Sequence, residues 1–176
     1  MKLAAAAAVL AVLAATAGPA NAEEVPTRDC RGRIESGRGP LSFVQHRAIV
    51  VGPIAFSGLL DAAPRRALGP WGDDGRLGRK SGVVVRAGRA VVLSVPERHR
   101  DRLFLHYTRG EAGTSEVRIV PCPPGTRAFS YDGRVGPVTG FSGGFSMTRP
   151  GCYPLDVRVE GGRAYRVRIA FGYPCR

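Results

Sequence analysis

The residues best suited to chemistry lie in the stretch GFSGG, Gly140–Gly144, which places Ser142 between glycines. The stretch fits the G-x-S-x-G pattern that presents a nucleophilic serine in many hydrolases. A serine nucleophile also needs a histidine as its base. His46 precedes Ser142, with Asp61 or Asp101 between them, which is the order of a trypsin-like protease. One interpretation is therefore a serine hydrolase that uses Ser142 and His46.

The residues around Ser142 favour a structural role instead. A hydrolase elbow needs a helix after the serine, but the next residues are GGFSMTRPGC, whose glycines and Pro150 leave no room for one. Phe141 also stands where trypsin-like proteases have an aspartate. We therefore expect a strand whose glycines permit a bulge or a close backbone approach. The leading prediction is a protein that is not an enzyme.

Other residues offer metal ligands without a metal-binding pattern. The histidines His46, His99 and His106 have no diagnostic spacing. The turn Asp73–Gly75 resembles the start of a calcium loop but lacks the spaced ligands that follow in one. We expect no metal and no cofactor, and a solvated turn at Asp73–Gly75.

Trp71 is the only tryptophan, and it lies in a segment rich in glycine and proline. An indole in such a position can stack on a sugar or anchor a partner. It can equally fold back and cover the core. Trp71 is therefore a candidate binding residue with a structural alternative.

The chain is strongly basic, with a formal net charge of +12. Arg158, Arg166 and Arg168 are predicted to share one face of the last hairpin, with Arg163 at its tip, which would form a patch for polyanions. The sequence shows neither a nucleic-acid module nor aromatic residues interleaved on that face. We expect an anionic cell-wall polymer or a glycan as the partner, and no specific nucleic acid.

The first 22 residues have the features of a secretory signal peptide. Lys2 precedes an apolar run, and Ala20-Asn21-Ala22 is a small-x-small cleavage site. The run is shorter than the ~20 apolar residues that a membrane span needs. We expect cleavage after Ala22 and a secreted or wall-associated monomer without a membrane span.

Four cysteines follow the expected cleavage site, and an even number in an exported chain predicts two disulfides. Three pairings are possible. Cys152 and Cys175 flank the last hairpin, whose ends lie near each other, so we favour Cys152–Cys175 together with Cys30–Cys122.

Short runs rich in β-branched residues recur along the chain, without helical periodicity. The expected strands are 47–51, 54–60, 83–86, 90–95, 102–108, 116–120, 141–148, 155–160 and 164–171. They predict an all-β, antiparallel β-sandwich of immunoglobulin-like architecture. We expect this domain to span residues 47–176, after an N-terminal segment, 23–46, that contains Cys30. The segments 61–81 and 122–140 are expected to be long loops.

The last two strands alternate apolar and polar residues, which predicts a hairpin with one buried face. A three-residue loop, Gly161–Arg163, would pair Val159 with Tyr165 and make that face wholly apolar. The same register would place Asp156 opposite Arg168, and Arg158 opposite Arg166. A second hairpin of this kind is predicted over 83–93, with Val85 opposite Val91.

Several motifs together resemble a known group of proteins. They are VGPIAFSGL at 51–59, VVVRAGRAVVLSVP at 83–96, Pro121-Cys122, Gly143-Gly144-Phe145, and PGC at 150–152 with the closing hairpin to Cys175. The chain is similar over most of 47–176 to small exported proteins of high-GC actinobacteria, a family without an assigned activity. The resemblance implies export and an all-β fold, makes 143–145 a strand signature, and brings no catalytic residue.

Overall fold

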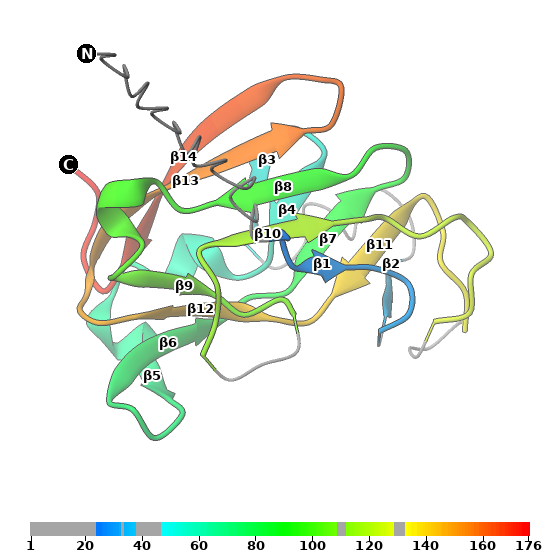
Figure 1. Cartoon of the computed structure of the whole chain (residues 1–176). Helices are drawn as coiled ribbons and strands as arrows, with labels where there is room; N and C mark the ends of the chain where they lie inside the picture. Colours follow the sequence, from blue (N-terminus) through cyan, green and yellow to red (C-terminus); the bar gives the residue numbers. More distant parts are fainter. Residues whose placement is uncertain (1–23, 33, 38–46, 109–111, 129–132) are drawn as a thin grey trace, which may run out of the picture.

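The computed structural model describes residues 24–32, 34–37, 47–108, 112–128 and 133–176, and Figure 1 shows their arrangement. The expected signal peptide lies outside these ranges. The described residues form strands and three short 3₁₀ turns, so the predicted all-β class is confirmed. The turns are η2 (Leu59–Asp61), η3 (Arg65–Ala67) and η4 (Glu97–His99). None of the helical turns described is long and apolar enough to cross a lipid bilayer.

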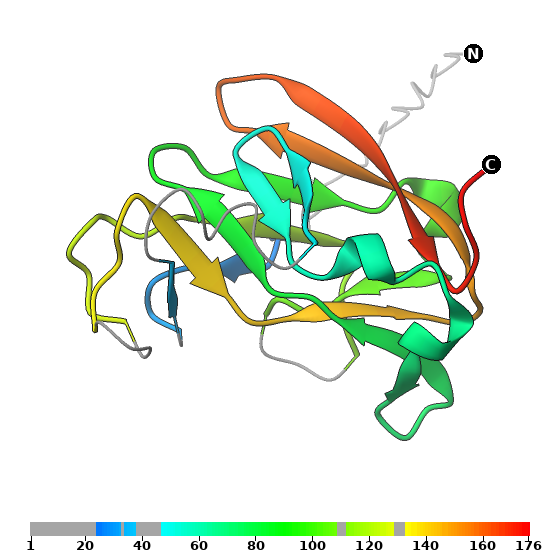
Figure 2. The same cartoon turned by 180° about the vertical axis from the view of Figure 1, so that it is seen from behind.

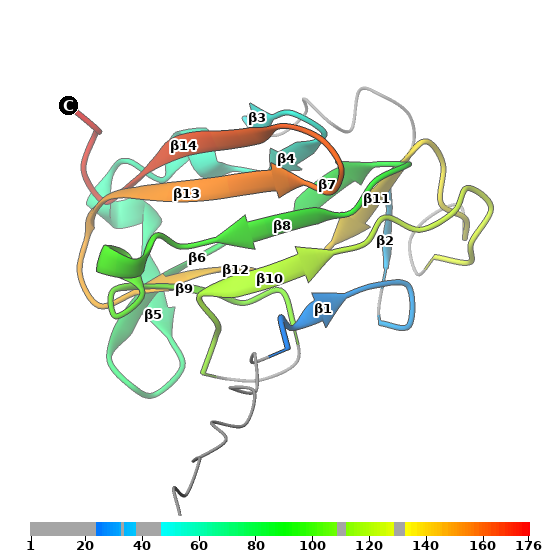
Figure 3. The same ribbon diagram turned by 45° about the horizontal axis from the view of Figure 1, so that its top comes forward.

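The largest strands belong to a five-stranded sheet, sheet A, which forms the front layer in Figure 3. Its strand pairs are antiparallel, apart from the parallel pair β1 and β10. In spatial order the strands are β1 (Thr27–Arg28), β10 (Glu116–Ile119), β8 (Val91–Ser94), β13 (Gly151–Val159) and β14 (Ala164–Phe171).

Two further sheets lie behind sheet A. Sheet B contains β2 (Glu35–Gly37), β11 (Val138–Phe141), β7 (Val83–Arg86), β4 (Ile54–Phe56) and β3 (Ile49–Val51). Sheet C contains β5 (Gly69–Trp71), β6 (Arg76–Lys80), β12 (Gly144–Met147) and β9 (Leu103–Leu105). The expectation of uninterrupted loops at 61–81 and 122–140 is therefore wrong, because these segments contain β5, β6 and most of β11.

Sheets B and C are joined by two chain segments that bend together. Ser81-Gly82 separates β6 from β7, and Ser142-Gly143 separates β11 from β12. Phe141 pairs with Val83 on one side of the bend, and Gly144 pairs with Lys80 on the other. The Ser81 amide donates to the Gly143 carbonyl (3.0 Å), so the bends face each other. Figure 2 shows β11 running on into β12 from behind.

Glycine is required at this bend because the residues that follow β9, His106 and Tyr107, come very close. A Cβ added to Gly143 would lie 2.2 Å from Cδ1 of Tyr107 and 2.6 Å from the His106 carbonyl oxygen. The buried Tyr107 hydroxyl donates to the Ser81 carbonyl (2.9 Å) across the same bend. The predicted close backbone approach in GFSGG is confirmed.

The apolar sides of all three sheets share one core. Phe145 of sheet C lies at its centre, with ring centroids 5.9 Å from Phe56 of sheet B and 5.4 Å from Phe171 of sheet A. Tyr107 meets Phe145 edge-on at 5.7 Å. These aromatic contacts connect sheet A to the two sheets behind it.

The last hairpin has the predicted apolar face but a different register. Leu155, Val157, Ile169 and Phe171 on this face are buried, whereas Tyr165 is exposed. Val157 lies opposite Tyr165, two residues from the expected pairing with Val167. The Val159 amide donates to the Arg163 carbonyl (3.0 Å), so the loop is 160–162 rather than 161–163. A shift of two residues preserves the faces. The expected register would have paired Arg158 with Arg166, and such a like-charge pair is unfavourable. In the observed register Arg158 faces Ala164, and Arg166 faces Asp156.

The predicted hairpin over 83–93 does not form. β7 lies in sheet B and β8 lies in sheet A, so Val85 is not opposite Val91. Val85 instead pairs with Ile54 and Thr139. Both strands bury apolar side chains on the core side, and this favours a connection from one layer to the other over a local hairpin.

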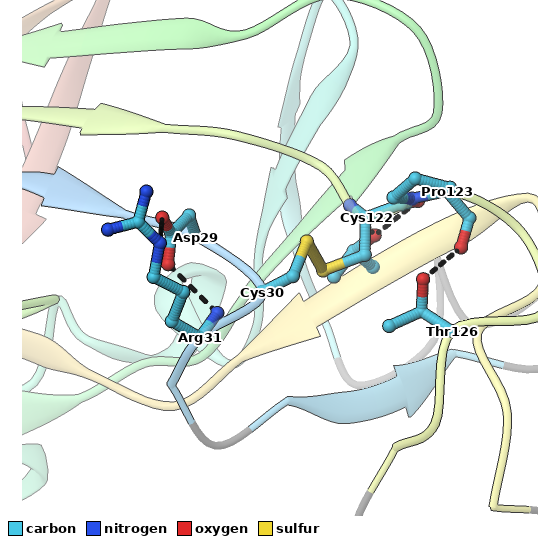
Figure 4. The surroundings of a disulfide bond; sticks show 7 residues. Asp29, Cys30, Arg31, Cys122, Pro123 and Thr126 are labelled. Carbon is cyan, nitrogen blue, oxygen red and sulfur yellow. Dashed lines mark hydrogen bonds and ion pairs between the residues drawn. A yellow bond between two sulfur atoms is a disulfide. The ribbon is translucent and has the colours of Figure 1, made fainter.

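Both predicted disulfides are present. Cys30–Cys122, drawn in Figure 4, has its Cα atoms 5.6 Å apart, and Cys152–Cys175 has them 5.2 Å apart. The first bond holds the segment after β1 to the segment that follows β10. The Asp29 carboxylate beside it accepts from the Arg31 amide (2.9 Å). Residues of the N-terminal segment thus supply β1 to sheet A and β2 to sheet B.

Candidate anion-binding site

Ser142 lies exposed at the bend between β11 and β12. Its hydroxyl has no hydrogen-bond partner within the described ranges. His46, its predicted base, lies outside the described residues. Asp61 is one of the two acids considered for a triad. Its Oδ1 forms an ion pair with Nε of Arg47 (2.5 Å).

The structure brings together a different serine and histidine. Oγ of Ser146, a wholly buried residue of β12, lies 2.7 Å from Nε2 of His106, just after β9. Burial is the main cause that lowers the pKa of His106 below 6.5, with the charge of Arg76 adding to it. The hydroxyl of Ser146 is closed to an external substrate, so it serves to hold the imidazole. No sequence motif pointed to this pair, because the two residues are 40 positions apart.

The remaining candidates for metal chemistry are dispersed. His99 lies in η4 beside sheet A, whereas His106 lies on sheet C. No group of three potential metal ligands is found among residues 24–32, 34–37, 47–108, 112–128 and 133–176. Asp74 of the turn Asp73–Gly75 pairs with the Arg76 side chain.

The arginines of the last hairpin share the outer face of sheet A, as predicted. Arg158 lies opposite Ala164, Asp156 opposite Arg166, and Pro154 opposite Arg168. These positions point away from the core, and the three arginines are exposed. Arg163, predicted at the tip, directly follows the loop 160–162 and is exposed.

Two of the four predicted arginines, Arg166 and Arg168, line a depression in the surface. This depression, the basic groove, lies between η4 and the outer face of β13 and β14. The ribbons of β13 and β14 are in the upper left of the molecule in Figure 1. The groove is open to solvent. Its lining residues are Arg98, His99, Arg102, Cys152, Pro154, Arg166 and Arg168. Arg158 and Arg163 lie toward the other end of the hairpin.

The guanidinium groups of the hairpin are held in place by local partners. Arg166 makes a two-pronged contact with Asp156, from Nε to Oδ1 (2.6 Å) and from Nη2 to Oδ2 (2.9 Å). This hydrogen bonding holds the pKa of Asp156 below its ordinary value. Nη1 of Arg168 donates to the backbone carbonyl of Arg176 (2.8 Å), and Cys152–Cys175 fixes that segment at the groove.

His99 adds a titratable group to the basic groove. Nε of Arg98 donates to its Nε2 (3.1 Å), which places the imidazole proton on Nδ1. Its Nδ1 is buried and has no partner in the described part of the chain. Burial is the largest cause that lowers the pKa of His99, and the charges of Arg98 and Arg102 lower it further. The imidazole is therefore neutral at pH 7, and the arginines carry the positive charge of the groove.

Sequence reasoning missed the η4 side of the groove. Arg98 and Arg102 lie in the segment PERHRDR, between β8 and β9, and its dense arginines were a visible signal. Their position beside β13 depends on β8 pairing with β13 in sheet A. The predicted hairpin over 83–93 obscured that pairing.

Comparison with known proteins adds no identification, since no family model, curated protein or solved structure matches the chain. The geometry of the chain itself therefore carries the functional argument.

Proposed function

We propose that this chain is a secreted, monomeric protein of immunoglobulin-like sandwich architecture that binds anionic polymers of the cell envelope without catalysing a reaction. The observation that carries this proposal is the convergence of four arginines, Arg98, Arg102, Arg166 and Arg168, on one groove. Two come from the η4 region and two from β14, so the tertiary fold brings them together. No aspartate or glutamate is among the described residues that line the groove.

The chemistry of arginine supports phosphate or carboxylate groups as ligands. Guanidinium presents a planar fork of donors that matches these anions, and it stays charged at any physiological pH. An open groove suits successive charges along a polymer better than one enclosed small molecule. Among the described residues that line the groove there is no Trp, Tyr or Phe on which nucleobases could stack, which disfavours single-stranded nucleic acid.

Several features support export and a module without catalysis. Two disulfides suit an oxidising compartment, and residues 1–22 have the composition of a signal peptide. Two apolar layers with one core are compatible with a sandwich. The exposed Ser142 sits in a bend whose glycines have a structural explanation.

The test is retention of the purified, oxidised protein on isolated cell wall and on immobilised polyphosphate at increasing salt. We expect retention at low salt and release as salt screens the contacts. Replacing Arg98, Arg102, Arg166 and Arg168 by alanine should abolish it. Retention of the wild type that does not respond to salt would contradict the proposal.

A matched control removes positive charge elsewhere. Arg127 and Arg134 are exposed in the connection between β10 and β11, at the end of the molecule opposite η4 (Figure 1). The Arg166→Ala/Arg168→Ala and Arg127→Ala/Arg134→Ala double variants lose equal charge. If both lose retention equally, net charge rather than the groove is responsible.

A further inference from the structure

A second depression, beside the β5–β6 hairpin, differs in composition from the basic groove. Its lining includes Trp71, Asp73, Asp74, Arg76, His106 and Thr108. The hairpin projects from the lower edge of the molecule in Figure 1, away from β13 and β14. Its lining combines an aromatic surface with hydrogen-bonding groups. Different neighbouring residues hold each of these side chains in place.

The indole of Trp71 lies flat on sheet C because two glycines leave room for it. A Cβ added to Gly78 would lie 2.2 Å from Cε3 of Trp71, and one added to Gly144 would lie 2.8 Å from its Cη2. Gly78 and Gly144 belong to the paired strands β6 and β12. The sheet therefore fixes one face of the ring. An aromatic group fixed in this way loses little conformational entropy when a ligand binds.

The imidazole of His106 forms the neighbouring wall. Its ring centroid lies 4.6 Å from that of Trp71 at an interplanar angle of 44°. The contact between its Nε2 and the buried Ser146 hydroxyl (2.7 Å) fixes the ring orientation. His106 is neutral at pH 7 because burial lowers its pKa. It can therefore hydrogen-bond a ligand without adding a charge.

Arg76 and Asp74 form a fixed polar pair on the other side. The Arg76 guanidinium lies over the Phe104 ring, 4.6 Å from its centroid, and donates to the Ala112 carbonyl (2.8 Å). It also donates to the Asp74 carboxylate. The Arg76 side chain is only 15% exposed, whereas that of Asp74 is 46% exposed. The carboxylate thus keeps capacity to accept hydrogen bonds from a ligand.

The charge of this lining decides the ligand class. Among the described residues of the lining, Asp73 and Asp74 outnumber Arg76, so anions are not favoured. A neutral ligand with an apolar face and several hydroxyls matches both the indole and the fixed polar groups. We propose that this depression, the Trp71 site, binds a neutral oligosaccharide, with a pyranose ring stacked on Trp71 and hydroxyl groups bonded to Asp74 and His106.

The single tryptophan makes a direct test possible. Because Trp71 is the only tryptophan, the intrinsic indole fluorescence of the whole protein reports this site. We expect its emission to shift and saturate on titration with cellohexaose or chitohexaose, two neutral β-1,4-linked oligosaccharides. Calorimetry should give the same affinity. If neither hexamer changes the emission or releases heat at millimolar concentration, the proposal is wrong.

Variants then distinguish stacking from nonspecific contact. Trp71→Ala should weaken binding at least about tenfold by calorimetry, as expected for an aromatic anchor. Asp74→Asn removes an exposed carboxylate and serves as a second variant should Trp71→Ala not fold. It should also weaken binding, whereas Asp101→Asn, exposed beside η4, should not. Equal affinity in wild type and Asp74→Asn would overturn the assigned hydrogen bonding.

The proposals for the basic groove and for the Trp71 site can be tested separately. Trp71→Ala should leave salt-dependent retention on polyphosphate unchanged, and Arg166→Ala/Arg168→Ala should leave oligosaccharide binding unchanged. Loss of sugar binding in the arginine variant would contradict a separate Trp71 site.

Discussion

Nε2 of His106 lies 2.7 Å from Oγ of Ser146, and the serine is fully buried beneath it. Burial and the charge of Arg76 both disfavour the imidazolium form, while the Asp74 charge opposes them. We predict that His106 titrates below pH 6.5, which NMR of its Hε1 resonance would measure. A titration midpoint at or above pH 6.5 would show that the Asp74 charge raises the pKa of His106 at least as much as burial and Arg76 lower it.

The same shift makes the free energy of unfolding depend on pH. The folded-state pKa of His106 is lowered, so the unfolded state takes up the proton first as pH falls below 6.5. Stability is therefore fully present above that pH and decreases toward the folded-state pKa. Urea unfolding at about pH 7.5 and about pH 5 should show a larger loss in wild type than in His106→Gln. Equal losses would assign the pH dependence to other groups.

The bend at Ser142-Gly143 gives a sharp prediction for stability. Gly143→Ala places a methyl group 2.2 Å from the buried Tyr107 ring and close to the His106 backbone. Because buried backbone cannot move aside, we expect a loss of at least about 2 kcal/mol in urea unfolding. Gly69→Ala is the matched control, since an added Cβ there meets nothing within 4 Å. Similar losses in both variants would mean that the bend relaxes readily.

The strands that could be predicted are those whose sequence carries its own pattern. β7 and β14 were predicted with the observed bounds, because β-branched or alternating residues mark them. β5 reads GPW and β6 reads RLGRK, which have little intrinsic strand preference. Pairing with β12 and stacking of Trp71 on Gly78 decide their conformation, and both are tertiary effects.

The candidate sites follow the same division. The face shared by Arg158, Arg166 and Arg168 depends on alternation within the two strands of one local hairpin, so it could be predicted from the sequence. The groove requires η4 to lie beside β13, which no local pattern specifies. Likewise, Ser146 and His106 are 40 residues apart and meet only because β12 pairs with β9.

The ion pair between Asp156 and Arg166 leads to a prediction about binding. Asp156→Asn should leave Arg166 with its full charge toward the groove and raise the salt concentration needed to release the protein from polyphosphate. An exposed pair contributes at most about 1 kcal/mol, so the fold should tolerate the change. Glu160→Gln is the control, because it frees Arg118 from a similar two-pronged pair outside the groove. Asp156→Asn should need a higher salt concentration for release than Glu160→Gln. Equal release concentrations would show that Arg166 does not contribute to retention.

The two disulfides should contribute unequally to stability. Cys30 and Cys122 are 92 residues apart, whereas Cys152 and Cys175 are 23 apart. Loop-closure entropy in the unfolded chain then gives about 4.5 kcal/mol for the longer loop and about 3.5 kcal/mol for the shorter. Paired Cys→Ser variants, compared by urea unfolding, should show the larger loss for Cys30/Cys122. The Cys152/Cys175 variant should instead show the larger loss of polyphosphate retention, because it releases the Arg176 carbonyl that orients Arg168. If both variants keep full retention, the position of Arg168 does not depend on this disulfide, and the groove is formed by β14 and η4 alone.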